Sequence, residues 1–187
     1  MDQRTAVVFV GIALALLAGI AAWLYMRHRK SKLLRDRFGP EYERVVRQEG
    51  NIRRGEGVLE FREKKRENLR IHPLSAAART DFSNRWLDVQ AQFVDDPEGS
   101  VARADSLVSE VMAARGYPVT DFAERADIIS VDHPTVVENY RAAHAIAVSR
   151  ARGQATTENL RTAMVHYRSL FEELLNDALP ERKEIRA

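Results

Sequence analysis

The stretch AAWLYMRHRKSKLLRDR, residues 21–37, decides the architecture predicted for this chain, because an apolar run ends at Met26 and a dense series of basic side chains begins at Arg27. The run extends back over residues 6–26, which read AVVFVGIALALLAGIAAWLYM and carry no charged side chain. As an α-helix these 21 residues would be about 31 Å long, which matches the hydrocarbon thickness of a bilayer. The sequence therefore predicts one transmembrane helix over residues 6–26, after a short N-terminal tail, residues 1–5.

A cleaved signal peptide is the alternative interpretation of the apolar run. Such a peptide has a basic start and an apolar core of about 7 to 15 residues. Here the start, MDQR, is weakly charged and the run is longer, although Gly19-Ile20-Ala21 resembles a cleavage site. Trp23 and Tyr25 lie at the end of the run, where amphipathic rings favour a membrane interface. We therefore favour a retained anchor.

The charges on either side of the run predict its orientation. The basic side chains that follow it are Arg27, Arg29, Lys30, Lys32, Arg35 and Arg37. On the N-terminal side, Arg4 and the α-amino group are offset by Asp2. The positive-inside rule then places the C-terminal part of the chain in the cytoplasm and the N-terminus outside. The same six cations form a predicted membrane-surface site that attracts anionic lipids, although we favour the simpler role of fixing topology.

Residues 27–72 are predicted to form a basic helical neck next to the membrane. They contain 15 basic and 8 acidic side chains, whereas residues 73–187 contain 13 basic and 18 acidic ones. After an interruption at Gly39-Pro40, interspersed Arg and Glu and a thin apolar stripe predict one long, solvated helix to about Asn68, frayed in its middle. The alternative is that the stripe seeds a coiled coil and a homodimer.

A compact helical bundle is predicted over residues 73–175, followed by a flexible tail, residues 176–187. Amphipathic stripes indicate four main helices and one short helix, and no stretch alternates with period two, so the predicted fold class is all-α. The expected helix starts are Ser75, Pro97, Asp121, Asp132 or His133, and Thr156 or Thr157, and the expected stops are Gly116 and Gly153. The expected core consists of Phe82, Trp86, Phe93, Leu107, Val111, Tyr140, Tyr167 and Phe171.

The residue types that carry catalysis or bind metals form no recognisable constellation in this sequence. The chain has no cysteine, which excludes a disulfide framework and a thiolate metal site. Its five histidines occur in neither spacing typical of a helix-bundle metal site, Glu-x-x-His or His-x-x-x-His. We therefore predict no catalytic residue, no metal and no cofactor. Because the basic excess lies in the neck, we do not predict nucleic-acid binding.

Arg115, Tyr140 and His144 are the polar side chains that most suggest a ligand groove. Together they could line a small pocket between helices for an anion or a peptide. The structural interpretation assigns Arg115 to a helix C-terminus, Tyr140 to the core, and His144 to a hydrogen-bonded position on an apolar stripe. We favour the structural interpretation and keep the groove as the alternative.

The sequence also resembles a set of uncharacterised bacterial membrane-anchored proteins. The segments that carry the resemblance are RFGPEY (37–42), RWLDVQAQFVDDPEGSVARADSLVSEVMAARGYP (85–118), SVDHPTVVENYRAAH (130–144) and LRTAMVHYRSLFEEL (160–174). The resemblance covers most of residues 32–175 and implies a bacterial origin and a recurring head domain. That family has no assigned activity, so the resemblance implies no residue roles.

These observations favour a membrane-tethered helical interaction or scaffold module over an enzyme. We expect a single-pass protein of the bacterial inner membrane, with the lipid bilayer and an unknown protein as partners. The alternative is an enzyme or small-ligand sensor with a pocket between helices around Arg115, Tyr140 and His144.

Overall fold

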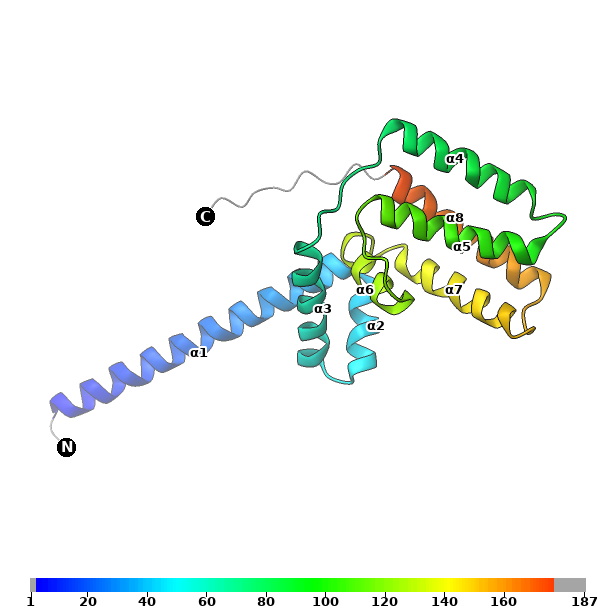
Figure 1. The fold of residues 1–187 in the computed structure, drawn as a ribbon. Helices are drawn as coiled ribbons and strands as arrows, with labels where there is room; N and C mark the ends of the chain where they lie inside the picture. The colour runs from blue at the N-terminus through cyan, green and yellow to red at the C-terminus, as the bar shows by residue number, and fades with distance from the viewer. Residues whose placement is uncertain (1–2, 177–187) are drawn as a thin grey trace.

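The computed structural model describes residues 3–176, and for residues 3–10, 12 and 13 it describes only the backbone. The described residues form eight α-helices and no strand, which confirms the predicted all-α fold class (Figure 1). The helices are α1 Gln3–Phe38, α2 Pro40–Glu49, α3 Ile52–Glu67, α4 Ala76–Ala91, α5 Pro97–Ala114, α6 Phe122–Asp132, α7 Val137–Ala151 and α8 Thr157–Asn176.

The long helix α1 projects away from the other helices, with its C-terminal end against them (Figure 1). Apolar side chains such as Leu16, Leu17 and Ile20 are exposed along it. Among the described residues, no helix is at once long enough and apolar enough to cross a membrane. Seven side chains of the predicted span, those of residues 6–10, 12 and 13, lie outside the described residues. The transmembrane helix over residues 6–26 therefore stays a prediction.

The predicted interruption at Gly39-Pro40 is confirmed, but the prediction of one long, solvated helix from there to about Asn68 is wrong, because a turn at Gly50 and Asn51 divides it into α2 and α3. Gly39, with φ at +48°, separates α1 from α2, and Pro40 occupies the first turn of α2. Gly50 adopts a left-handed conformation with φ at +66°, which glycine tolerates best. The Asn51 side chain then caps α3 by accepting a hydrogen bond from the Arg53 amide at 2.8 Å. α2 and α3 thus form a helical hairpin beside the C-terminal end of α1 (Figure 1).

The hairpin and the end of α1 share a small apolar core. This core consists of Leu34, Phe38, Tyr42, Val45, Leu59 and, from α6, Val131. The stripe that was predicted to seed a homodimer consists of Tyr42, Val45, Val46, Ile52, Leu59 and Phe61. Tyr42, Val45 and Leu59 are buried in this core, and Val46 is partly buried against it. The other two members of the stripe, Ile52 and Phe61, are exposed at 52% and 67%. Dimerisation through the neck stays a prediction.

Helices α4 to α8 form the head and confirm the predicted helical bundle. α7 packs along α8, α8 also packs against α5, and α4 lies against α5 on the outer side (Figure 1). Trp86 of α4 stacks on Phe171 of α8, with ring centroids 4.6 Å apart. The predicted core residues are all buried in one contiguous core except Phe93, which is only partly buried against it.

Most predicted helix starts in the head are confirmed by a side-chain cap. Each cap accepts a hydrogen bond from a backbone amide three residues later: Ser75 from Ala78 at 3.1 Å, Asp96 from Gly99 at 2.9 Å, Asp121 from Glu124 at 3.0 Å and Thr156 from Asn159 at 3.2 Å. Gly116 and Gly153, the predicted stops, both have positive φ angles.

The predicted helix start at Asp132 or His133 is wrong. The His133 amide donates a hydrogen bond to the Ile129 carbonyl at 2.8 Å, so it closes α6 instead of opening α7. The Asp132 carboxylate accepts hydrogen bonds from the Tyr117 hydroxyl at 2.9 Å and from Arg66, and no side chain caps α7. α7 begins at Val137, after a turn.

Two glycines in α3 provide a matched test of the hairpin. A Cβ atom added at Gly55 would lie 2.9 Å from both Cα and Cγ2 of Val46 on α2, whereas one added at Gly57 would meet no atom within 4 Å. We expect Gly55→Ala to lower the free energy of unfolding by about 1–3 kcal/mol through overpacking. Gly57→Ala should raise it by up to about 1 kcal/mol, because alanine favours helix. Thermal unfolding of the full chain, followed by circular dichroism, measures both, and equal midpoints would contradict the close approach of α2 and α3.

Candidate functional site

A buried carboxylate on α2, that of Glu41, connects the hairpin to the head. Glu41 is fully buried. Its Oε1 accepts hydrogen bonds from Arg44 Nη2 and Arg62 Nη1, both at 2.7 Å. Its Oε2 accepts hydrogen bonds from Arg44 Nε at 2.7 Å and from Arg141 Nη1 at 2.8 Å. Three guanidinium groups, from α2, α3 and α7, therefore converge on one carboxylate.

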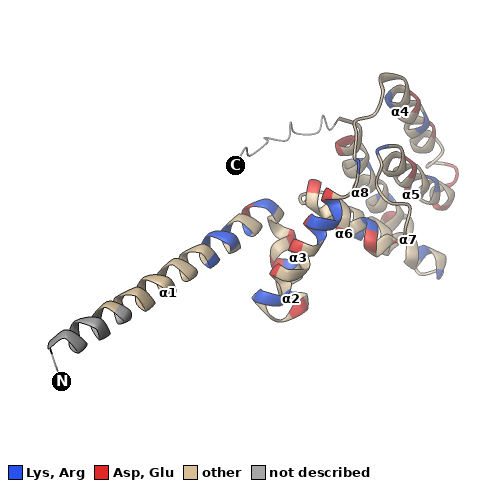
Figure 2. Ribbon diagram, turned by 60° about the vertical axis from the view of Figure 1, so that its left-hand side comes forward, with Lys and Arg blue, Asp and Glu red and all other residues tan. Residues whose placement is uncertain are grey.

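Asp127 brings α6 into the same cluster. Its Oδ1 lies 2.6 Å from Arg62 Nη2 and 3.2 Å from Arg141 Nη2. Ser130, one turn further along α6, accepts a hydrogen bond from Arg62 Nη1 at 3.3 Å and donates one to the Asp127 carbonyl at 2.6 Å. We call the five charged residues, Glu41, Arg44, Arg62, Asp127 and Arg141, the charge hub. Acidic and basic residues are interspersed over α2, α3 and α6 (Figure 2).

The electrostatics of the charge hub favour an ionised Glu41. Burial alone would raise the pKa of this carboxyl group. The hydrogen bond from Arg44, the charge of Arg141 and the hydrogen bond from Arg62 outweigh burial and lower the pKa below its ordinary value. Conversely, the hydrogen bond to Glu41 raises the pKa of Arg44. The cluster is therefore an ion network at neutral pH.

A second polar contact joins α3 to α6. Arg66 forms an ion pair with Asp132, and Lys65 forms one with Glu124. The Tyr117 hydroxyl donates to Asp132 at 2.9 Å, and burial, with the Asp132 charge, raises the Tyr117 pKa well above its ordinary value. The hairpin is thus fixed to the head at two places along α3.

The six basic residues predicted to face the membrane surface divide into two groups. Three pair with carboxylates of the hairpin: Lys30 with Glu60 at 2.7 Å, Arg35 with Glu43 at 3.4 Å and Arg37 with Glu63 at 2.9 Å. The other three, Arg27, Arg29 and Lys32, are exposed, and none has a carboxylate partner among the described residues. The Arg27 guanidinium lies 5.5 Å from the centroid of the Trp23 ring. Half of the predicted surface charge is therefore offset within the protein.

The structure does not bring Arg115, Tyr140 and His144 together as one site. Arg115 is fully buried and donates from Nη1 to the Leu174 carbonyl at 2.8 Å, near the C-terminal end of α8. Tyr140 and His144 instead lie against Phe122, with ring centroids 4.8 Å and 3.6 Å from its ring. Arg115 therefore satisfies a backbone carbonyl near the C-terminal end of α8. It does not line a common pocket with Tyr140 and His144, as the enzyme or sensor alternative required.

Tyr140 and His144 border a polar cluster inside the head. The Tyr167 hydroxyl donates to Asp105 Oδ1 at 2.9 Å, and Arg125 donates to the Ser109 hydroxyl at 2.8 Å. Burial raises the pKa of Tyr140 to about 12 and lowers the pKa of His144. Both groups are therefore neutral at pH 7, which suits side chains that pack in a helical core.

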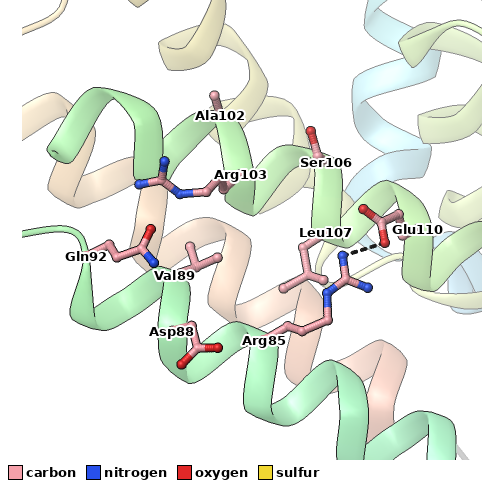
Figure 3. Close-up of a pocket in the computed structure, with 9 residues that line it drawn as sticks. All are labelled: Arg85, Asp88, Val89, Gln92, Ala102, Arg103, Ser106, Leu107 and Glu110. Carbon is pink, nitrogen blue, oxygen red and sulfur yellow. Dashed lines mark hydrogen bonds and ion pairs between the residues drawn. The ribbon is translucent and has the colours of Figure 1, made fainter.

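A groove of about 360 Å³ lies on the head between α4 and α5 (Figure 3). Its lining residues are Arg85, Asp88, Val89, Gln92, Ala102, Arg103, Ser106, Leu107 and Glu110. Val89 and Leu107 point between the two helices and form an apolar floor. Arg85 reaches across from α4 and donates to Glu110 of α5 at 2.6 Å. The groove therefore has an apolar base and a charged rim, and sequence reasoning did not identify it.

Sequence reasoning also missed the charge hub, although one signal was present. Arg62 follows Gly55 and Leu59 at helical spacing, on the face that is buried against α2 and α6. An arginine on a buried face needs a buried carboxylate. Glu41, an acidic residue in the first turn of α2, was not recognised as that carboxylate.

Neither a metal-binding arrangement nor a similar protein gives a further assignment. Among the residues that the structure describes, no group of three or more His, Asp and Glu side chains is arranged to hold a metal ion. Comparison with protein-family models, with curated proteins and with solved structures gives no match to this chain.

The charge hub is tested by a change at Glu41 and a matched change at Glu43. Glu41→Gln should lower the free energy of unfolding at neutral pH by about 3 kcal/mol, because it leaves clustered guanidinium groups without their buried carboxylate. Glu43→Gln, in the same helix, removes only an exposed pair with Arg35 at 3.4 Å and should have little effect. Unfolding of the full chain by denaturant measures both, and similar losses in the two variants would contradict a central role for Glu41.

The lowered pKa of Glu41 predicts how the stability of the fold depends on pH. A carboxyl group with a lowered pKa in the folded state contributes stability above its unfolded pKa, which is about 4.3. That contribution is lost as the pH falls through the lowered pKa of the folded state. The difference in unfolding free energy between the wild-type chain and Glu41→Gln should therefore be constant from neutral pH to about pH 5 and shrink below about pH 4. A difference that grew on acidification would contradict the assigned ionisation.

Proposed function

We propose that this chain is a membrane-tethered helical interaction module that holds its head in a fixed orientation at the membrane surface. The observation that carries the proposal is the charge hub, because it joins the hairpin at the end of α1 to α6 and α7 of the head. A tether that only kept the head nearby would need no more than a flexible linker. Here charged side chains of the hairpin bond directly to charged side chains of the head, as Glu41 does to Arg141 and Arg62 to Asp127. The orientation of the head therefore follows that of α1.

The apolar run and its basic flank support the membrane part of the proposal. Residues 6–26 are free of charge, and six basic residues follow within residues 27–37. This pattern supports a single-pass protein of the bacterial inner membrane with its N-terminus outside and its head in the cytoplasm.

The groove between α4 and α5 is the docking surface that we assign to a protein partner. Its lining residues recur at helical spacing on both walls. Arg85 and Asp88 lie on α4 with Gln92 at its C-cap, and Arg103, Ser106 and Glu110 lie on α5. The polar rims extend along residues 85–92 and 103–110 on either side of an apolar floor, and such a groove suits an amphipathic helix lying along it. We therefore assign the groove to a helix of a partner protein, with apolar side chains against Val89 and Leu107. Tethering would raise the effective concentration of such a partner at the same membrane.

Photo-cross-linking in bacterial cells tests this function. A photoreactive residue placed at Gln92 or Ser106, both exposed at the groove, should give an adduct with the same protein, and one at Thr162, exposed on α8, should not. A peptide from the helix of the captured protein should bind the full chain, and Asp88→Lys in the groove should weaken that binding more than Glu158→Lys at an exposed position of α8. Removing residues 1–26 should sharply lower the adduct yield, because the two proteins would no longer share a membrane.

Three outcomes would contradict the proposed function. Adducts of equal yield at Gln92, Ser106 and Thr162 would indicate nonspecific contact. Equal sensitivity of peptide binding to Asp88→Lys and Glu158→Lys would place the partner outside the groove. An adduct yield that did not change without residues 1–26 would remove the role of the tether.

A further inference from the structure

A second groove, of about 400 Å³, lies between α1 and α3. Its lining residues are Trp23, Met26, Arg27 and Lys30 from α1, and Arg53, Glu56, Gly57 and Glu60 from α3. The α1 residues are the last of the apolar run and the first of the basic series. The groove therefore lies at the level where the predicted transmembrane helix leaves the hydrocarbon, next to an aromatic ring that favours the interface.

Some of the charged side chains that line this groove have partners of opposite charge or hydrogen-bond donors within the protein, and others do not. Lys30 and Glu60 neutralise each other at 2.7 Å, and Glu56 accepts hydrogen bonds from Ser31 and, at 3.0 Å, from the Tyr42 hydroxyl. Both carboxylates are thus engaged by groups of the protein. Neither Arg27 nor Arg53 has a carboxylate partner among the described residues, although both line the groove. Two guanidinium groups are therefore open to an anion.

The solvent-facing side of α3 extends this positive surface. Its exposed residues at helical spacing are Arg53, Arg54, Gly57, Phe61 and Lys64. From Arg53 to Lys64 these exposed side chains are three cations and one aromatic ring, and the exposed acid Glu67 lies at the C-terminal end of the helix, away from the groove. Basic and apolar side chains on one face are typical of a helix that lies on a membrane surface. Gly57 has no atom within 4 Å of the position of an added Cβ, so the backbone there is open to a ligand. Ile52, at the start of α3, adds an exposed apolar side chain next to Arg53.

We infer that the groove between α1 and α3 binds the phosphate of an anionic phospholipid, with Arg27 and Arg53 as its ligands, and that the N-terminal end of α3 lies in the headgroup layer. The inference rests on the proposed membrane tether. A lipid fits better than a soluble anion because Trp23 and Met26 supply an apolar wall on the side of the predicted hydrocarbon. An anionic lipid fits better than a zwitterionic one because the lining carries a net positive charge and both of its carboxylates are already engaged.

This assignment differs from the membrane-surface site predicted from the sequence. That prediction took its six cations from residues 27–37, but Lys30, Arg35 and Arg37 are paired with carboxylates of α2 and α3. Arg27 stays in the site, and α3 supplies Arg53. Arg53 lies too far along the chain from the apolar run for the positive-inside rule to select it.

Lipid selectivity of the full chain, reconstituted in phosphatidylcholine vesicles, tests the groove. The wild-type chain should associate with spin-labelled phosphatidylglycerol in preference to spin-labelled phosphatidylcholine. Arg53→Gln should reduce this preference about fivefold, because the variant loses the attraction of one cation for the anionic headgroup. Arg79→Gln, the same change at an exposed position on α4, should leave it unchanged. Equal preferences in the two variants would overturn the assignment, and so would loss of the preference in excess inorganic phosphate, which would indicate a site for a free anion.

A site-directed label tests the position of α3 independently. The chain has no cysteine, so Ile52→Cys and Val165→Cys each introduce a single labelling site, at helical positions exposed by 52% and 62%. In vesicles with phosphatidylglycerol, a fluorophore at residue 52 should be shielded from a water-soluble quencher and one at residue 165 should not. Equal quenching would overturn the inference while leaving the tether in place. If the full chain does not float with vesicles at all, the proposed membrane tether fails instead.

Discussion

The carboxylate of Glu41 is the constraint on which the arrangement of this molecule depends. An ionised carboxylate cannot be buried without partners, because its loss of hydration costs several kcal/mol. Its partners here come from three helices, and the one on α7 lies 100 residues further along the chain. The carboxylate is satisfied only when the hairpin lies against α6 and α7. The position of the head relative to α1 is therefore fixed by the same contacts that keep Glu41 charged.

The helix α3 is central to this arrangement because its faces meet three different environments. One face buries Gly55, Leu59 and Arg62 against α2 and α6. A second presents Glu60 and Glu63 to basic residues of α1 and offsets part of their charge. The third is exposed and mostly basic, with Arg53, Arg54 and Lys64, and it ends at the acidic Glu67. A helix with charge on every side looks like a solvated spacer in sequence, but here each side has a separate electrostatic role.

The sequence predicted the parts of the fold that depend on local signals. Helix caps such as Ser75 and Asp121, and stops such as Gly116, were identified because a cap and its amide are three residues apart. The core of the head was identified because apolar stripes keep helical spacing. The charge hub was not, because Arg62 and Glu41 are 21 residues apart and their pairing depends on a turn at Gly50. The start of α7 was misplaced because Asp132 bonds to Tyr117, a contact with no local signature.

Ion pairs, more than apolar contacts, set the angle between α1 and the head. The apolar core that joins them is small and includes only Val131 from the head. Apolar contact is non-directional, so a patch of this size would permit the hairpin to slide or rotate on α6. The guanidinium groups of Arg62 and Arg141 each contact both Glu41 and Asp127, and such planar forks form hydrogen bonds only in a narrow range of orientations. The groove between α4 and α5 therefore follows any change in the direction of α1. In the function proposed above, this coupling would make the head a surface module instead of a freely moving domain.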